Sequence, residues 1–302
     1  MTQQKYLILI VGPTAVGKTD LCVKLAKELK CDIFSCDSRQ FYKEMSIGTA
    51  KPTEMEQAGV KHHFIDHLSI TDAYTVADFE KEALAALEET FETHQYAIMT
   101  GGSGLFAKAI THGFDHIPET PAHIREELMQ RLETDGMETL QQQLMHLDPD
   151  FCETADIHNK QRVIRALEIC LATGKPFSSF RIGETAERPF EILKIGLDRP
   201  REELYSRINH RVDIMLAEGL VKEVENLRPY ASKNALQTVG YKEVFEYLAG
   251  QSSYEEMVRL IKRNTRRYAK RQLTWFRNQD NFTWFNPSQI IDIKEFIYSY
   301  KK

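Results

Sequence analysis

The chain has 302 residues, is 42% hydrophobic and carries a formal net charge of −5, which predicts a globular protein with one large domain and a smaller inserted one. Its apolar runs are too short to cross a membrane, no signal peptide precedes the first run, and its five cysteines lack the C-x-x-C spacing of a zinc ribbon. We therefore expect a cytoplasmic protein that contacts no membrane.

The first predicted elements are a strand, a glycine-rich turn and a helix. An apolar run at 5–11 has strand length, and residues 20–29 have helical spacing. The turn between them fits G-x-x-x-x-G-K-[ST] and comprises Gly12, Pro13, Thr14, Ala15, Val16, Gly17, Lys18 and Thr19. The N–H groups of such a loop face one anion, the lysine adds positive charge, and the hydroxyl of Thr19 can ligate Mg²⁺. We predict a phosphate-binding P-loop; the alternative is a chance match in an ordinary strand–helix turn.

Two later strand ends bear on the chemistry. A strand at 32–36 is followed by Asp37, which would project beside the loop at the carboxyl edge of a parallel sheet. An N-cap or Asx-turn is an equally good interpretation of Asp37. A strand at 96–100 ends in Thr100 and glycines, where a nucleotide hydrolase usually has a Mg²⁺-binding carboxylate. This ending weakens the case for a hydrolase.

Helices replace the strand–helix alternation after about residue 113. Thr120 is the expected N-cap of the first of them, with Pro121 at the first helical position. A strand returns at 190–198. Helical segments are predicted at about 76–93, 105–110, 121–134, 136–147, 158–173 and 254–278.

These elements predict an α/β fold. It consists of a parallel sheet that contains the P-loop and is flanked by helices, an inserted all-helical domain and a helical C-terminal region. The catalytic core would comprise residues 1–113 and 191–302, and the insertion residues 114–190.

Charge is unevenly distributed in this acidic protein. No acidic residue occurs from Met257 to Gln279, whereas eight lysines and arginines do. Aromatic residues are interleaved with these cations, a combination on which single-stranded RNA loops stack. The alternative is a helix with an ordinary apolar core face and solvated charges.

Beyond these separate features, the chain resembles the tRNA dimethylallyltransferases over nearly its whole length. The matching stretches are GPTAVGKT (12–19), DSRQFY and IGTAKP (within 37–52), HHFIDH (62–67), GGSGLF (101–106), QRVIRALE (161–168), RINHRVDIMLAEGL (207–220), VGYKE (239–243) and AKRQLTWFR (269–277). The resemblance implies transfer of the dimethylallyl group of dimethylallyl diphosphate to N6 of the adenosine 3′ to the anticodon in tRNA. It also implies a requirement for Mg²⁺ and release of diphosphate.

The resemblance also assigns roles to residues. It implies that Asp37 is the general base and that Ser103, Arg207 and Arg211 act in the active site. Ser103 stands where the family usually has threonine, and Phe106 where it usually has tyrosine. The residues implied to contact tRNA are Asp37, Ser38, Arg39, Gln40, Ser103, Gln161, Arg162, Val163, Ile164, Arg165, Gly240, Lys270, Arg271, Gln272 and Arg277.

Arg207 and Arg211 lie four residues apart, so on a helix they share one face and can grip one anion. From the residues alone, a solvated surface pair is the favoured interpretation, because Glu203 can bridge to Arg207.

Other functions share parts of this pattern. A small-molecule kinase would have the loop and a helical insertion but would not need the basic helix. An adenylate isopentenyltransferase would share the chemistry without an RNA face, and a nucleotide-dependent RNA-binding module would lack catalysis. We expect a monomer whose partner surface is supplied by tRNA.

Overall fold

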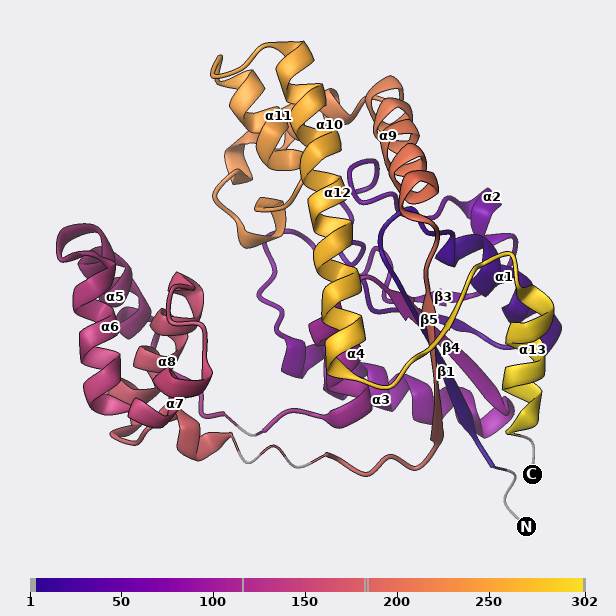
Figure 1. Ribbon diagram of the computed structural model, residues 1–302, viewed down its shortest axis with the longest axis horizontal. Helices are drawn as coiled ribbons and strands as arrows, with labels where there is room; N and C mark the ends of the chain where they lie inside the picture. Colours follow the sequence, from indigo (N-terminus) through magenta and orange to yellow (C-terminus); the bar gives the residue numbers. More distant parts are fainter. Residues whose placement is uncertain (1–3, 116, 182, 184, 301–302) are drawn as a thin grey trace. The chain divides into compact units, whose positions relative to one another are not determined.

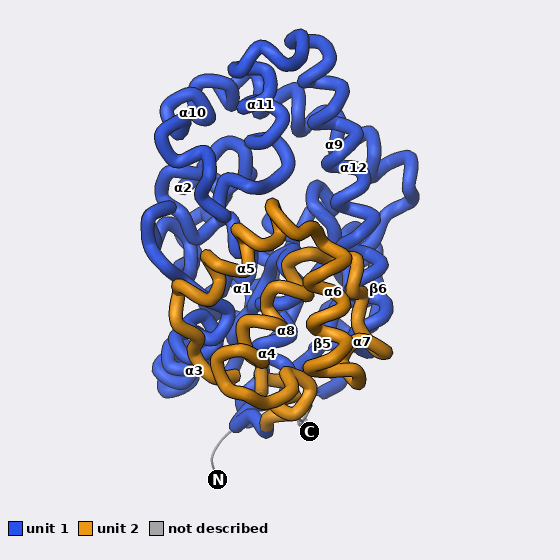
Figure 2. Tube along the Cα trace, turned by 90° about the vertical axis from the view of Figure 1, so that its left-hand side faces the viewer, with its two compact units in different colours: residues 1–111, 187–302 blue, residues 112–186 orange. Residues whose placement is uncertain are grey.

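The computed structural model describes residues 4–115, 117–181, 183 and 185–300. The chain divides into two compact units (Figure 2): unit 1 comprises Met1–Thr111 and Glu187–Lys302, and unit 2 comprises His112–Ala186. Unit 2 ends four residues before the 190 expected from the sequence. Contacts of Arg188 account for this difference: its Nε donates to the Ile110 carbonyl at 2.9 Å and its Nη2 to Glu80 at 2.6 Å, both in unit 1.

Unit 1 is built on a six-stranded parallel sheet (Figure 1) with the strand order β3-β2-β4-β1-β5-β6. The strands are β1 (Tyr6–Val11), β2 (Ile33–Ser35), β3 (His62–His63), β4 (Tyr96–Gly101), β5 (Glu191–Leu197) and β6 (Thr283–Phe285). The sequence predicted β1, β2, β4 and β5. It missed β3 and β6, which have only two and three residues; β2 is as short as β6 but lies within the strand predicted at 32–36.

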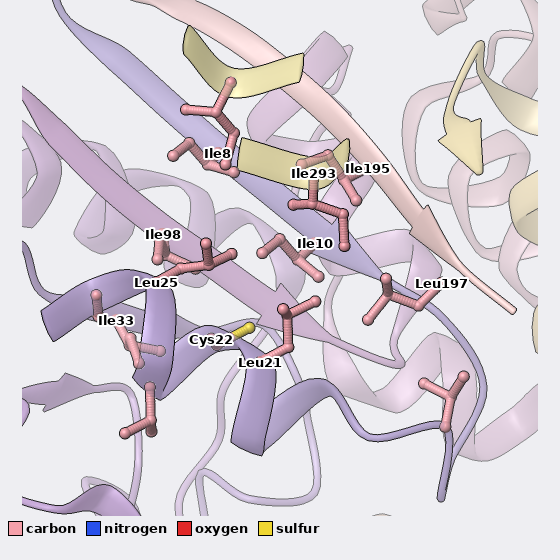
Figure 3. Packing of buried hydrophobic residues seen from close by; sticks show 14 of the residues in the cluster. Ile8, Ile10, Leu21, Cys22, Leu25, Ile33, Ile98, Ile195, Leu197 and Ile293 are labelled. Carbon is pink, nitrogen blue, oxygen red and sulfur yellow. The ribbon is translucent and has the colours of Figure 1, made fainter. Parts of the chain in front are cut away.

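Alternate side chains of the central strands enter separate cores on the two faces of the sheet. In β1, Ile8 and Ile10 pack on one face, and Leu7 and Leu9 on the other; all four are fully buried. Figure 3 shows the first of these cores, where Ile8 and Ile10 meet side chains of the first helix and of the neighbouring strands. Burial on both faces explains why these strands are continuous apolar runs in the sequence.

Helices cover both faces. Those of unit 1 are α1 (Lys18–Leu29), α2 (Glu54–Gln57), α3 (Val76–Thr93), α4 (Gly104–His112), α9 (Arg201–Ala217), α10 (Leu220–Asn226), α11 (Tyr241–Leu248), α12 (Tyr254–Gln279) and α13 (Ile290–Ser299). Residues of α1 and α13 join the Ile8 core, and residues of α3 and α4 join the Leu7 core. None of the helices in the described parts of the chain is long and apolar enough to cross a membrane.

The long helix α12 takes part in three cores. Ala269 packs in the Ile8 core and Phe276 in the Leu7 core, while Met257 and Ile261 join α9, α10 and α11 in a third. The helix therefore has the apolar face that the ordinary interpretation required. Its basic residues are exposed or half-buried.

Unit 2 contains α5 (Ala122–Thr134), α6 (Gly136–Leu147), α7 (Pro149–Thr154) and α8 (Lys160–Thr173), with a core of its own. The start of α5 corrects one expectation. Pro121 is the N-cap and no side chain caps the helix, so Thr120 lies outside it. The Thr120 hydroxyl instead accepts a hydrogen bond from Arg165 Nη1 at 3.3 Å.

Candidate active site

The glycine-rich loop, residues 12–19, connects β1 to α1 at the carboxyl edge of the sheet. Gly12 is required by space, because a Cβ there would lie 2.7 Å from the Leu197 carbonyl oxygen. Ala15 has a φ of 63°, a left-handed conformation that costs an alanine about 1 kcal/mol or more and is typical of loops held for a ligand. The loop is thus a fixed, strained turn at the edge where open α/β sheets bind ligands.

Lys18 lies in this loop with its ammonium group turned back onto the loop. Its Nζ donates to the carbonyl oxygens of Gly12 and Pro13, both at 2.9 Å. Burial lowers the pKa of Lys18 to about 8, and the charge of Asp37 opposes part of that shift. The attraction of Asp37 therefore does not compensate for the hydration that the Lys18 ammonium group loses on burial.

Two arginines tie α9 and the segment before it to the loop. Arg207 Nε donates to the Ala15 carbonyl at 2.8 Å, and Arg199 Nε donates to the Val16 carbonyl at 2.6 Å. Glu203 pairs with Arg199 and not with Arg207, so the surface pair considered from the sequence does not form. The sequence analysis missed Arg199; its position two residues after the end of β5 was the available signal.

Arg211 lies one helical turn beyond Arg207 and is also half-buried. Burial and, next, the positive charge of Arg207 lower the pKa of Arg211. Two neighbouring positive charges without a strong counterion form a site that is stabilised when an anion binds. Lys18, Arg207 and Arg211 give this edge of the sheet that character.

Asp37 lies just after β2. The sequence left two interpretations open, a carboxylate beside the glycine-rich loop and an Asx-turn, and the geometry is compatible with both. Its Oδ1 accepts a hydrogen bond from the Arg39 N–H at 3.1 Å, which is an Asx-turn. Its Oδ2 faces Gly102, where an added Cβ would lie 3.6 Å away. One carboxylate oxygen thus shapes the turn, while the other lies close to the loop that follows β4.

Ser103 and Ser38 meet beside Asp37. The Ser103 hydroxyl accepts from the Ser38 N–H at 3.1 Å and lies 3.1 Å from the Ser38 hydroxyl. Phe106 instead packs against Phe41 and Phe79, with ring centroids 5.4 and 5.2 Å apart. A phenylalanine suits these apolar surroundings, so only Ser103 contributes a polar group here.

Gln272 is one of the residues that the resemblance implies contact tRNA, but its side chain is hydrogen-bonded within the protein. It is only 6% exposed and bonds the two loops at the sheet edge: Oε1 accepts from the Thr14 N–H at 2.9 Å, and Nε2 donates to the Gly102 carbonyl at 2.8 Å. Burial raises the pKa of the neighbouring Tyr268 to about 12. Tyr268 is one of the aromatic residues interleaved with the cations of 257–279, and nothing in the sequence indicated that it lies at this edge of the sheet.

The other implied RNA contacts on α12 remain accessible. Lys270 and Arg271 are exposed, and the structure gives them no acidic partner within the described residues. The Arg271 guanidinium lies 5.8 Å from the Tyr268 ring centroid. Arg277 is exposed as well, but it pairs with Asp198 and lies over the Trp284 ring.

Gln40 and Gly240, two further residues with an implied tRNA contact, are held by hydrogen bonds within the protein. The Gln40 amide donates to the carbonyls of Thr49 and Ala50, both at 3.3 Å, while the Arg39 side chain is half-buried. Gly240 is buried and caps α11, with its N–H donating to Glu243 at 2.7 Å. These bonds leave the side chain of Gln40 and the N–H of Gly240 engaged within the protein.

Two of the unit 2 residues that the resemblance implies contact tRNA are buried. Val163 and Ile164 are 0% exposed and pack in its core, so their side chains cannot reach RNA. Arg162 is exposed. Gln161 accepts from Arg125 at 3.0 Å, and Arg165 donates to the buried Glu168 at 3.1 Å.

The fold and the site define an α/β enzyme-like architecture in which a glycine-rich loop, a cationic cluster and a carboxylate share one edge of a parallel sheet. Residues 40–279 match the family model described as IPP transferase. The chain is 52% identical over 294 residues to the tRNA dimethylallyltransferase of Christiangramia forsetii, covering 96% of this chain and 97% of the relative.

Two solved structures of tRNA-modifying transferases are similar to this chain. The full-length tRNA isopentenylpyrophosphate transferase of Bacillus halodurans has a TM-score of 0.72 at 40% identity and covers 98% of this chain and 96% of its own. A eukaryotic dimethylallyltransferase acting on tRNA has a TM-score of 0.78 at 27% identity and covers 99% of this chain and 80% of its own. The chain belongs to the IPP transferase family, that of the tRNA dimethylallyltransferases, and is a prenyltransferase.

Proposed function

We propose that this protein transfers the dimethylallyl group of dimethylallyl diphosphate to N6 of the adenosine 3′ to the anticodon in tRNA. The observation that carries the proposal is the convergence of an anion site and a carboxylate at one sheet edge. Lys18, Arg207 and Arg211 supply the anion site, and Asp37 faces the adjoining loop. Family membership gives the prenyl transfer to tRNA.

The donor diphosphate would lie at the glycine-rich loop. As the allylic C1–O bond breaks, its electron pair goes to the diphosphate, so negative charge builds on the leaving oxygens. Preorganised cations and backbone N–H groups at that point are worth several kcal/mol in a site shielded from water. The loop carbonyls bound by Arg207 and Lys18 fix those cations before the donor arrives.

Mg²⁺ fits as an ion carried by the diphosphate. The Thr19 hydroxyl is partly exposed in the first turn of α1 and makes no side-chain hydrogen bond to a described residue. Within the described chain no cluster of three or more His, Cys, Asp or Glu residues could hold a metal by itself. Mg²⁺ at phosphates commonly takes few protein ligands and keeps phosphate and water oxygens. Thr19 would be its protein ligand, and the bound ion would neutralise charge on the leaving group.

The acceptor would approach from the Asp37 side. The exocyclic nitrogen of adenine is a weak nucleophile whose protons become acidic once the new N–C bond forms, so an ionised carboxylate suffices as acceptor. Asp37 Oδ2 is directed at the adjoining loop, and the hydroxyls of Ser38 and Ser103 lie next to it. Extruding one base from an anticodon loop costs a few kcal/mol. The exposed cations of α12 and of α8 supply phosphate contacts that offset part of this cost.

We further propose that the protein works as a monomer in the cytoplasm. All of the groups assigned to the donor and to the acceptor adenine come from one chain. Light scattering on the purified protein with and without tRNA tests the stoichiometry, and a dimer that is required for activity would contradict it.

The function is tested with purified protein, Mg²⁺, unmodified tRNA and either labelled dimethylallyl diphosphate or labelled ATP. We expect prenyl label in tRNA without any ATP requirement. ATP cleavage matching product formation would favour a kinase, and modification of free AMP with no affinity for tRNA would favour the adenylate enzyme. Binding of RNA without either label being transferred would leave only a binding module.

A further inference from the structure

One residue of α12 behaves unlike its neighbours in sequence. Lys270 and Arg271 are exposed, whereas Gln272 is buried, and both ends of its amide are hydrogen-bonded to backbone. The orientation of the amide is fixed, since only its oxygen can accept from the Thr14 N–H and only its nitrogen can donate to the Gly102 carbonyl.

The two backbone partners belong to different sides of the proposed reaction. Thr14 is in the glycine-rich loop after β1, and Gly102 follows β4. These strands are paired in parallel, with Val11 opposite Gly101, so the two loops leave the sheet side by side. The amide of Gln272 therefore bridges the donor loop and the loop that precedes Ser103.

Gly102 shows how closely the bridge fits. A Cβ at Gly102 would lie 2.2 Å from Gln272 Nε2 and 3.6 Å from Asp37 Oδ2. The bridge therefore occupies the space next to the carboxylate that faces the acceptor. The Thr14 N–H is also already engaged by Gln272, so in this structure it is not available to a phosphate.

We propose that Gln272 is a positioning residue that holds the diphosphate loop in register with the acceptor loop, and thereby sets the approach of the adenine nitrogen to the allylic carbon. The inference rests on the proposed function. It differs from the role implied by resemblance, in which Gln272 contacts RNA.

The inference predicts a change in product partition. In productive transfer, the C1–O electron pair leaves with diphosphate, the N6 lone pair forms the N–C1 bond, and the N6 proton passes to Asp37. If the loops lose register, water can capture the allylic carbon instead: its oxygen forms the C–O bond and its proton goes to solvent, giving a prenyl alcohol and diphosphate. A misplacement of about 1 Å can cost about 10²-fold in rate.

The first test is Gln272→Met, which keeps the volume but loses both hydrogen bonds. Single-turnover reactions with labelled dimethylallyl diphosphate and saturating tRNA give prenyl-tRNA and prenyl alcohol separately. We expect transfer to slow by roughly 10- to 100-fold and the ratio of alcohol to prenyl-tRNA to rise several-fold. The dissociation constant for tRNA should stay within about two-fold. Transfer and partition both equal to those of the parent, or weaker tRNA binding with unchanged transfer, would overturn the inference.

The second test is Gln272→Glu. Its effect should change with pH within one and the same variant, which a misfolded protein would not show. An ionised glutamate can accept from the Thr14 N–H but cannot donate to the Gly102 carbonyl, whereas a protonated one can do both. Burial raises the pKa of such a carboxyl, so the protonated fraction grows as the pH falls. The transfer rate of Gln272→Glu divided by that of the parent should therefore rise as the pH falls from 8 to 5.5.

Gln279→Glu is the matched control, because it makes the same change at an exposed position of α12. A rate ratio for Gln272→Glu as flat with pH as that of Gln279→Glu would refute the positioning role. A parent enzyme that transfers no prenyl group would refute the proposed function and the inference with it. A transferring parent matched by both Gln272 variants would refute the inference alone.

Discussion

Lys18 should make donor binding depend on pH. Its pKa in the protein is about 8, because burial outweighs the attraction of Asp37. The protonated ammonium is the form that attracts a diphosphate, and a bound diphosphate raises the pKa of Lys18 in the complex. Donor binding should therefore not change with pH through Lys18 below about pH 8, where its ammonium is charged, and should weaken above it.

The size of the effect follows from the pKa. One pH unit above 8, about a tenth of free enzyme molecules carry the charged lysine, so affinity at pH 9 should be about tenfold lower, or about 1.4 kcal/mol. Three groups around Lys18 do not titrate in this range: burial raises the pKa of Cys22 to about 12 and also raises that of Cys36, while Arg211 stays charged. The donor itself is fully ionised above about pH 7.

Calorimetry between pH 7 and 9 in buffers of different ionisation enthalpy measures both affinity and proton exchange. We expect uptake of nearly one proton per donor at pH 9 and almost none at pH 7. Lys18→Arg is the control, since a guanidinium stays charged and should remove the proton uptake. Uptake that persists in Lys18→Arg, or affinity that is constant to pH 9 in the parent, would refute this account of the site.

Four further outcomes are expected. Asp37→Asn should lower the single-turnover rate by roughly 10² to 10⁴ while tRNA affinity stays within a few-fold, and a rate within three-fold of the parent would reduce Asp37 to its Asx-turn. Arg207→Ala should weaken donor binding and slow transfer together; unchanged values of both would contradict its role. Replacing both Lys270 and Arg271 with alanine should weaken tRNA binding and flatten its salt dependence by about one unit per lost phosphate contact, measured against the exposed pair Lys24 and Lys27 on α1 as a control. Glu168→Ala removes a buried carboxylate shared by two half-exposed arginines, so unit 2 should lose about 1 to 2 kcal/mol of stability by thermal or denaturant unfolding, and no loss would mean that the pairs are energetically neutral.

The sequence by itself determined the parts of the molecule whose signals are local. The G-x-x-x-x-G-K-T turn, the apolar runs of β1 and β4 and the helical spacing of α3 and α12 each lie within one continuous segment, and the structure has each of these elements where its pattern predicted it. Resemblance across the whole chain gave the family, because its motifs are distributed from residue 12 to residue 277.

Tertiary structure decided which residues meet and which are hidden. Gln272 reaches Thr14 across 258 positions of sequence, and Arg199 reaches Val16 across 183, so no local pattern could connect either pair. Val163 and Ile164 belong to a stretch that the resemblance implies contacts tRNA, yet they lie on the apolar side of α8 and pack in the core of unit 2. A motif records which residues accompany a function, but only the packing of the chain decides whether each side chain faces the ligand, another loop or the interior.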